Sequence, residues 1–333
     1  GADPGPICYG KGGRHPTISD ANMLLGRLNT RKLNAVAGGV GVTDIAAVFD
    51  RELGAALGLD AVQAAEAVIR LANAKMAGAI RMVSLSLGAD PRDFALFAFG
   101  GAGPLHAAAL ARELGVPRVL IPARPGITNA LGCAVADLRH DFVQTINQPL
   151  DDLDIKSLHA AFDAQVAAGQ EALARESVAV RDVQRSFSVD MQFQGQSHVV
   201  RVHLDSGEPS AQELRDRFER VYWNRFKVEL PEIKARIVNA NCSVIGVCDP
   251  VDLEQLIDPA GKGATAIATG QRAVTFDGSV RDTPVYWRDQ LPVDVVIDGP
   301  ALIEQLDCTI LIPPGDRVVG GVDGNLTIHI GAE

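Results

Sequence analysis

The sequence has few cysteines, and none of them pair at a metal-binding spacing. Its five cysteines are scattered along 333 residues, and no CxxC motif occurs. This argues against a zinc ribbon or a disulfide framework. Nothing in the opening residues resembles a signal peptide, so we expect a cytoplasmic protein.

Basic charge and long apolar runs are also scarce. The chain carries 31 Lys and Arg against 41 Asp and Glu, a net charge of −10. Recognition of phosphate backbones needs a basic surface, so the balance argues against a general nucleic-acid binder. No apolar run approaches the roughly 18 residues of a membrane span. The length and the 47% hydrophobic content fit two or three globular domains.

The clearest helical pattern begins at Asp60. Asp60 and Gln63 have the spacing of a capping box. Apolar residues then recur every three or four positions from Val62 to Val83, and Gly88 is a natural stop. We expect a long helix that packs along a domain, and a shorter one near residues 43–57.

A strand, helix, strand pattern covers residues 94–122. The run 94–99 predicts a buried strand, 104–114 a helix that Gly115 ends, and 116–121 a second strand parallel to the first. The turn between strand and helix contains Gly100, Gly101 and Gly103. Bare backbone before a helix start lets an anion approach free N–H groups, so a phosphate or nucleotide is the natural ligand.

Three kinds of glycine turn compete for this stretch. A Rossmann turn needs a glycine where His106 stands and an acid after the second strand, where Ile121-Pro122-Ala123 stands. A Walker A loop needs Ser or Thr after Gly-Lys, and Gly261-Lys262-Gly263 lacks it. The adenosine-side GG turn of the actin, Hsp70 and sugar-kinase superfamily fits best. The alternative is that the glycines only allow the helix and strand to pack closely.

Other polar residues have both a binding and a structural interpretation. Thr128 and Asn129, at the start of a helix expected to reach Leu138, form a second candidate edge of the nucleotide site or merely cap that helix. His106 is a candidate for ligand or metal contact, with capping or packing as the alternative. Asp20 is expected to cap a helix at 21–28.

Some reactive residue types have a weaker case. Asp137 and Asp141 are four apart and would share a helix face if the helix continued, but with His140 they are too few for a metal site, and we expect none. Cys8 is expected to be an ordinary thiol.

The character of the sequence changes around residue 150. We therefore divide the chain into residues 1–150, of α/β type, and residues 151–333, which are strand-rich. The expected elements there are an exposed helix at 155–176, a hairpin of 187–193 with 200–204, a helix capped by Ser210, strands at 237–247 and from 293 onward, and a loop-rich stretch at 249–290 with one or two short strands.

Long motifs resemble the hydantoinase A / 5-oxoprolinase family. They are GADPGPICYGKGG followed by PTISDANMLLGRLN, GADPRDFALFAFGGAGPLHAAALARELGVPRVLIPARPGITNALGCAVAD, VDMQFQGQ and GPALIEQLDCTILIPPG, found in this order from residue 1 to 315. The resemblance implies part of an actin-like ATPase (ribonuclease H-like) fold followed by a strand-rich α+β region. It assigns Gly100, Gly101 and Gly103 to the adenosine side of the ATP site.

The resemblance also implies the chemistry. Family members use ATP to phosphorylate a carbonyl or enolate oxygen, with Mg²⁺ and positioning carrying the phosphoryl transfer. We expect a cyclic-amide hydrolase of the hydantoinase or 5-oxoprolinase type. The alternatives are the large subunit of an ATP-dependent ketone carboxylase and a non-catalytic fragment that binds nucleotide or a partner.

The departures from the family pattern matter equally. Family chains usually begin with a DxGGTxxD phosphate loop, and a second glycine-rich phosphate loop precedes GADPGP; this sequence contains neither. It therefore resembles a C-terminal half. We expect most phosphate and Mg²⁺ contacts to come from an N-terminal half or a partner subunit, catalysis to require that partner, and the assembly to be oligomeric.

Overall fold

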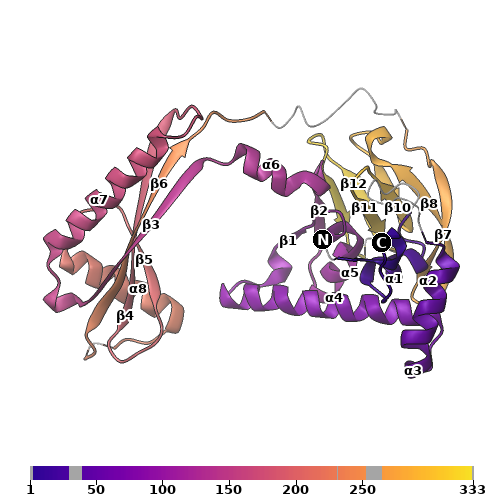
Figure 1. Cartoon of the computed structure of the whole chain (residues 1–333), viewed down its shortest axis with the longest axis horizontal. Coiled ribbons are helices and arrows are strands. Elements are labelled where there is room, and N and C mark those ends of the chain that lie inside the picture. The colour runs from indigo at the N-terminus through magenta and orange to yellow at the C-terminus, as the bar shows by residue number, and fades with distance from the viewer. Residues whose placement is uncertain (1–2, 30–39, 231, 253–264, 332–333) are drawn as a thin grey trace. The chain divides into compact units, whose positions relative to one another are not determined.

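The computed structural model describes residues 3–29, 40–230, 232–252 and 265–331. These residues form two compact units, one made of Gly1–Gly132 with Asp252–Glu333 and the other of Cys133–Val251. We describe each unit by itself (Figure 1). In the described part of the chain, no helix is both long and apolar enough to cross a membrane.

A five-stranded sheet lies at the centre of the first unit. Its β1 and β2 run parallel with α5 between them, so the predicted strand, helix, strand unit is confirmed. The last strand of the chain, β13, pairs antiparallel with β2. The sheet order and bounds are β1 (Ala95–Phe97), β2 (Arg118–Ile121), β13 (Leu326–His329), β12 (Arg317–Gly320) and β9 (Val296–Asp298), and α5 spans Gly103–Leu114.

A four-stranded sheet also belongs to this unit. The stretch expected to be loop-rich contains a regular antiparallel hairpin, β7 with β8. Leu105 of α5 packs with apolar residues of this sheet, which places the start of α5 beside it. The order and bounds are β11 (Thr309–Ile312), β10 (Ala301–Glu304), β8 (Ser279–Trp287) and β7 (Gly270–Phe276).

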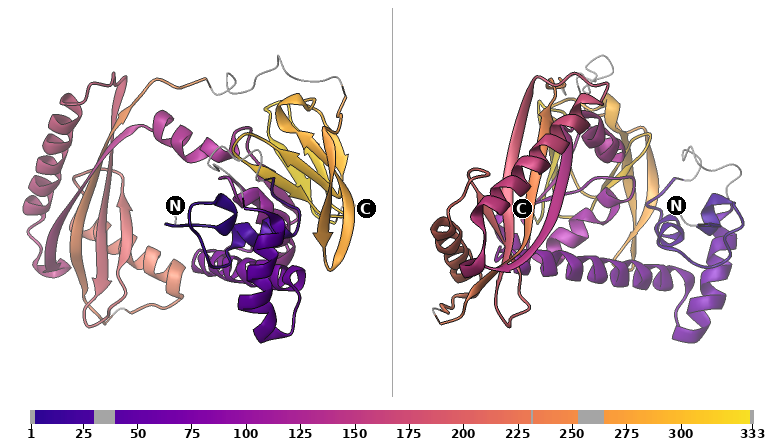
Figure 2. Two further views of the ribbon diagram at one scale, coloured as in Figure 1. Left: turned by 45° about the vertical axis from the view of Figure 1, so that its right-hand side comes forward. Right: turned by 60° about the vertical axis from the view of Figure 1, so that its left-hand side comes forward.

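Helices α1 to α4 form the N-terminal part of the first unit. The long helix α4 is a single rod of 26 residues (Figure 2), with the predicted capping box of Asp60 and Gln63. The helix expected at 43–57 is present, with a π-helical turn in its middle. The bounds are α1 (Ile18–Leu24), α2 (Val42–Phe49), η3 (Asp50–Gly54), α3 (Ala55–Leu57) and α4 (Ala61–Ser86).

The second unit is a four-stranded antiparallel sheet with two helices. The predicted hairpin of β4 and β5 is confirmed, with Val189 opposite Val202. Helix α7, expected to be exposed, instead buries Leu158 and Phe162 completely. The order and bounds are β3 (Leu138–Pro149), β6 (Ala235–Val247), β4 (Asp182–Phe193) and β5 (Val200–Leu204), with α7 at Ile155–Ala174 and α8 at Ala211–Phe226.

The α/β class and the strand-rich C-terminal region are confirmed. The division at residue 150 stays a prediction. The two spatial units do not follow the order of the chain, because strands β7 to β13 lie with residues 1–132.

The run at 94–99 forms β1, but it is not buried as expected. Phe94, Phe97 and Phe99 are 56%, 46% and 39% exposed, while Leu96 is half-buried and Ala98 is buried. Alternate residues of a strand face opposite sides of a sheet. One side of β1 therefore packs on the core, and the other lacks a covering layer in the described residues.

Candidate functional site

The glycine turn leads into α5 without a side-chain cap. Ala102 occupies the N-cap position and makes no side-chain hydrogen bond to the first turn of the helix. The N–H groups at a helix start and the positive end of its dipole favour an anion when no side chain satisfies them. Pro104 has no N–H, and the Leu105 N–H donates to the Ala102 carbonyl at 3.1 Å, so the backbone donors that the turn offers a ligand come from residues 101–103.

The three glycines of the turn differ in whether the structure requires a residue without a Cβ. Gly100 has φ +81°, which disfavours any residue with a Cβ. A Cβ at Gly101 would lie 3.0 Å from the backbone oxygen of Asp307. Gly103 has no positive φ, and no heavy atom lies within 4 Å of the place its Cβ would take. Neither backbone strain nor packing within the described residues requires glycine there, so Gly103 is the position most consistent with close approach of a ligand.

A second loop is tied to the glycine turn. The Gly100 N–H donates to the Pro125 carbonyl across 2.6 Å. The Thr128 hydroxyl lies 3.1 Å from the same oxygen and 2.9 Å from the Arg124 carbonyl, to which it donates. Pro125 begins the short helix η5 (Pro125–Ile127), which leads into α6 (Thr128–Val135). Thr128 thus bonds its own turn, and Asn129 is exposed beside it.

The β10–β11 turn supplies a third side. Asp307 lies against both other loops, since a Cβ at Gly126 would come within 2.1 Å of its side chain and Gly101 faces its backbone oxygen. The Gln305 amide donates to the Ala123 carbonyl at 3.3 Å. Three loops distant in sequence therefore converge at the start of α5.

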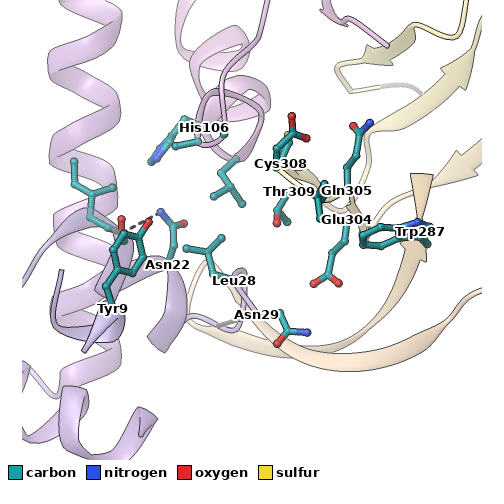
Figure 3. A pocket seen from close by; sticks show the side chains of 17 residues that line it. Tyr9, Asn22, Leu28, Asn29, His106, Trp287, Glu304, Gln305, Cys308 and Thr309 are labelled. Carbon is teal, nitrogen blue, oxygen red and sulfur yellow. Dashed lines mark hydrogen bonds between the residues drawn. The ribbon is translucent and has the colours of Figure 1, made fainter. Parts of the chain in front are cut away.

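A pocket of about 220 Å³ opens where these loops meet α1 (Figure 3). Gly101 lines it, whereas Gly100, Gly103, Thr128 and Asn129 lie outside its lining. The lining residues come from the opening loop and α1, from the start of α5, and from the end of β8 through the β10–β11 turn: Tyr9, Ile18, Ser19, Asn22, Leu28, Asn29, Gly101, Ala102, Leu105, His106, Trp287 and 304–309.

Asn22 places a buried acceptor at this pocket. Its side chain is 2% exposed, and its amide nitrogen donates to the Ile18 carbonyl at 3.1 Å. That bond fixes which end of the amide is the nitrogen, because a carbonyl can only accept. The Asn22 Oδ1 has no hydrogen-bond partner among the described residues, and Figure 3 shows it turned toward the side where Leu28 and His106 lie. A buried amide oxygen without a donor is costly, so this position suits a ligand N–H or a water molecule.

His106 lines the same pocket as a neutral side chain. It is 6% exposed, and its Nδ1 lies 2.8 Å from Asn73 Oδ1. An amide oxygen only accepts, so Nδ1 carries the proton and Nε2 is the acceptor. Burial and, secondarily, the charge of Arg27 lower the pKa of His106 below its ordinary value. The structure agrees with the packing interpretation of His106, and contact of His106 with a ligand stays a prediction.

Two carboxylates stand at the β10–β11 end of the pocket. The buried carboxylate of Glu304 pairs with Arg272 of β7 at 2.5 Å. Asp307 also lines the pocket, and its side chain lies close to Gly126. The Gln305 Oε1 is buried and lacks a partner in the described part of the chain. This turn therefore adds negative charge and a buried amide to the pocket wall.

The opening loop is held by Asp20. Thr17, not Asp20, is the N-cap of α1, and Asp20 is the third residue of its capping box. The expectation for Asp20 is therefore wrong in position. Its carboxylate also accepts from the backbone N–H groups of Ile7 and Cys8, at 3.2 and 2.7 Å. Burial, followed by the hydrogen bond and charge of Asp20, raises the pKa of Cys8 to about 12, which agrees with an unreactive thiol.

The stretch from Asp137 to Asp141 is not helical. α6 ends at Val135 and β3 begins at Leu138, so the two aspartates do not share a helix face. Asp141 pairs with Arg139, and Asp137 accepts from the Cys248 N–H. Within the described ranges, no group of three or more His, Cys, Asp or Glu could hold a metal ion.

Sequence reasoning did not identify Asn22, Glu304 or Gln305 as lining residues. Asn22 lies in the quoted motif PTISDANMLLGRLN, but a single mid-helix Asn carries no binding signal. The β10–β11 turn is separated from the glycine turn by about two hundred residues, and only the fold brings them together.

A glycine turn between a strand and an uncapped helix, beside a pocket of mixed polar and apolar lining, is a feature of α/β proteins that bind an anionic ligand. The comparisons identify the family. The model for hydantoinase/oxoprolinase matches residues 1–142, and the model for the hydantoinase/oxoprolinase C-terminal domain matches residues 151–331. The chain belongs to the hydantoinase/oxoprolinase family.

Relatives in this family include enzymes that differ in substrate. The chain is 35% identical to the caprolactamase subunit alpha of Pseudomonas jessenii, covering 96% of this chain and 47% of the relative. It is 28% identical to the acetophenone carboxylase gamma subunit of Aromatoleum aromaticum, covering 96% and 45%. The chain thus spans about half the length of these two relatives, and about a quarter of the 5-oxoprolinases it matches, such as that of Dictyostelium discoideum at 27%.

Solved structures give the same picture. The crystal structure of ATP-dependent caprolactamase from Pseudomonas jessenii superposes with a TM-score of 0.80 at 32% identity, covering 99% of this chain and 49% of that one. Nucleotide-free acetone carboxylase superposes with a TM-score of 0.71 at 22% identity, covering 97% and 48%. The second likeness supports the fold alone.

Proposed function

We propose that this chain is the C-terminal, nucleotide-binding portion of an ATP-dependent cyclic-amide hydrolase of the hydantoinase or 5-oxoprolinase type. The observation that carries the proposal is the glycine turn at the uncapped start of α5. Residue 103 of this turn is a glycine although neither its backbone conformation nor the packing around it requires one. The higher identity to a caprolactamase subunit, 35% against 28% for a ketone carboxylase subunit, favours an amide over a ketone as substrate.

The residues present fit part of an ATP molecule. The start of α5 suits an anionic group, and the neutral acceptor of Asn22 suits an N–H donor such as the amino group of adenine. A volume of about 220 Å³ is smaller than the usual pocket of a drug-sized ligand. It holds a ring-sized group, so the rest of the nucleotide would lie over Gly100 and Gly103 and against a second polypeptide.

Mg²⁺ would be held elsewhere. The described residues contain no cluster of metal ligands. Of the two carboxylates that line the pocket, Glu304 is already paired with Arg272, and Asp307 alone is too few ligands for a metal site. We therefore expect Mg²⁺ to be bound by the partner half together with the phosphates.

The chemistry assigned to ATP is the activation of an amide. When bound, ATP would supply a phosphoryl group to the amide oxygen, which would make the amide carbon more electrophilic toward water before the C–N bond breaks. This chain would hold the adenosine side and orient it through the Gly100–Gly103 backbone, with Thr128 and Asn129 at the neighbouring loop. Neutral His106 would keep an acceptor beside α5 without adding positive charge.

The proposal is tested by calorimetric titration of Mg-ATP into this chain, alone and with a complementary half. The probe is Gly103→Asp, because its side chain would occupy the space over the glycine turn in which the nucleotide is proposed to lie, while the fold has room for the side chain. Gly101→Asp would be less informative, since Asp307 already crowds that position. The matched control is Gly78→Ala in α4, another helical glycine with open space around it.

We expect Gly103→Asp to weaken ATP binding at least about tenfold, a loss of roughly 1.4 kcal/mol, and Gly78→Ala to leave it unchanged. A titration of ITP, which lacks the amino group of adenine, tests Asn22 in parallel. If neither the chain nor its mixture with the complementary half binds ATP, the proposal fails.

A further inference from the structure

Seven exposed apolar side chains gather at the end of α4 and around β1. Met82, Val83, Leu85 and Leu87 are 69%, 61%, 77% and 75% exposed, and the three phenylalanines of the β1 region are 39–56% exposed. We call these residues the α4–β1 surface: Met82, Val83, Leu85, Leu87, Phe94, Phe97 and Phe99. Large apolar side chains exposed in such number at one helix end and along one strand make these elements candidates for an interaction site.

The C-terminal end of α4 is apolar, and its side chains are exposed in the described part of the chain. The predicted stripe packs on the core as far as Ala77 and Ile80. From Met82 to Gly88, every residue except Ser84 is exposed. In Figure 1 the last turns of α4 extend on the side where β1 lies. Val83 and Leu87 continue the stripe of Ile80, whereas Met82 and Leu85 lie on the opposite side of the helix, so this helix end is apolar on both sides. An apolar helix end beyond its own core needs another surface to cover it.

The strand contributes a free edge. β1 is the first strand in the sheet order and, among the described residues, pairs only with β2. Natural sheets protect free edges with charge, proline, a bulge or a very short edge strand. β1 reads Ala-Leu-Phe, so its length of three residues is the only one of these protections that it has. Its outer edge is therefore suited to the addition of another strand.

Two of the exposed phenylalanine rings already contact each other in this structure, without a partner bound. The rings of Phe97 and Phe99 contact each other, with centroids 5.4 Å apart and planes tilted by 42°. Aromatic residues and Met are enriched in protein interfaces, and charged side chains are depleted at their centres. The composition of the α4–β1 surface follows this pattern.

We propose that the α4–β1 surface is the docking site for the half of a family-length enzyme that this chain does not span, with a strand of that half adding to β1 and apolar side chains covering Phe97, Phe99 and the end of α4. The choice of occupant follows from length, since the chain covers 44–49% of relatives that align with it almost from end to end. The inference rests on the proposed function for the identity of the partner, and it does not depend on ATP binding.

The test uses the part of the Pseudomonas jessenii caprolactamase alpha subunit that this chain does not match, expressed as a separate polypeptide. Its binding to the full 333-residue chain is measured by biolayer interferometry. The variant is Phe97→Ser with Phe99→Ser, which removes the exposed ring pair. The matched control is Ile267→Ser with Val322→Ser, because those side chains are 75% and 87% exposed elsewhere on the same unit.

We expect the phenylalanine variant to weaken binding at least about tenfold and the control to change it less than about twofold. Thermal unfolding of each variant establishes that it is folded. A second variant, Val83→Ser with Leu87→Ser, changes two exposed residues on one side of α4 and reproduces the loss from the helix. Equal binding of the folded phenylalanine variant and wild type overturns the inference.

Two further results bear on the choice of occupant. Sedimentation that reveals a dimer of this chain, lost in the phenylalanine variant, would assign the surface to a second copy and overturn the inference. Absence of ATP binding with docking intact would count against the proposed function alone. The two proposals can therefore fail independently.

Discussion

The amide N–H of Gly100 and the carbonyl oxygen of Pro125 are joined by a hydrogen bond of 2.6 Å. This bond connects the glycine turn to the loop that starts α6. Because Thr128 bonds the same oxygen, the two regions predicted from sequence to contact a nucleotide are structurally one unit. A change in either loop is expected to affect the other.

Gly100 and Gly103 are expected to respond differently to alanine. Gly100→Ala forces a Cβ into left-handed backbone and should cost about 1–2 kcal/mol of unfolding free energy. Gly103→Ala has open space and should leave stability unchanged or slightly raised, since Ala favours a helix over Gly. Urea unfolding of both variants measures the difference. A similar loss at the two positions would mean that Gly103 also has a structural role.

Removal of the Asp20 carboxylate is expected to loosen the opening loop. Asp20→Ala leaves the buried N–H groups of Ile7 and Cys8 without an acceptor and should cost about 3 kcal/mol. Asp60→Ala, at the exposed N-cap of α4, is the control and should cost only about 1 kcal/mol. Equilibrium unfolding compares them. Equal losses would show that Asp20 acts only as part of a capping box.

Stability should fall in mild acid because of His106. Its pKa is lowered in the folded state, so the unfolded chain binds the proton more readily. The contribution is complete above the ordinary pKa of 6.5 and is lost as pH falls from there through the lower folded value. His106→Gln should reduce the slope of unfolding free energy against pH by up to about 1.4 kcal/mol per unit. The exposed His203→Gln is the control, and equal slopes in the two variants would contradict the prediction.

The cysteines are expected to differ in how fast a thiol reagent labels them. Cys133 is exposed, whereas Cys8 and Cys308 are buried and burial raises the pKa of each to about 12. A thiol reagent at neutral pH should therefore label Cys133 first and the two buried thiols only after unfolding, because the thiolate is the reactive form. Mass spectrometry of the peptides measures the labelled fraction of each cysteine over time. Early labelling of Cys8 would show that the opening loop detaches in the native state.

Local signals predicted much of the first unit. The capping box of Asp60, the glycine that ends α5 and the order of strand, turn and helix around Gly100 all depend on neighbours within a few residues. The family motifs carried the assignment to the hydantoinase/oxoprolinase family for the same reason, since they are contiguous. Asp20 was placed wrongly by three residues because Thr17 competes for the same cap.

Other features depended on the environment of the whole chain. The apolar run at β1 predicted burial, but burial depends on a covering layer, and the described residues provide one on only one side. The stretch at 249–290 lacked strong strand signals, and pairing of β7 with β8 defines strands there.

The sequence by itself determined the helix and turn chemistry, the family and the glycine turn, because each is encoded by residues close together in the chain. Only the tertiary structure decided that β13 pairs with β2 and that the turn at 305–308 faces Gly101, because those contacts join residues some two hundred positions apart. The same structure left the acceptor of Asn22 facing a pocket and the rings of Phe97 and Phe99 uncovered, since both depend on what does and does not pack against them.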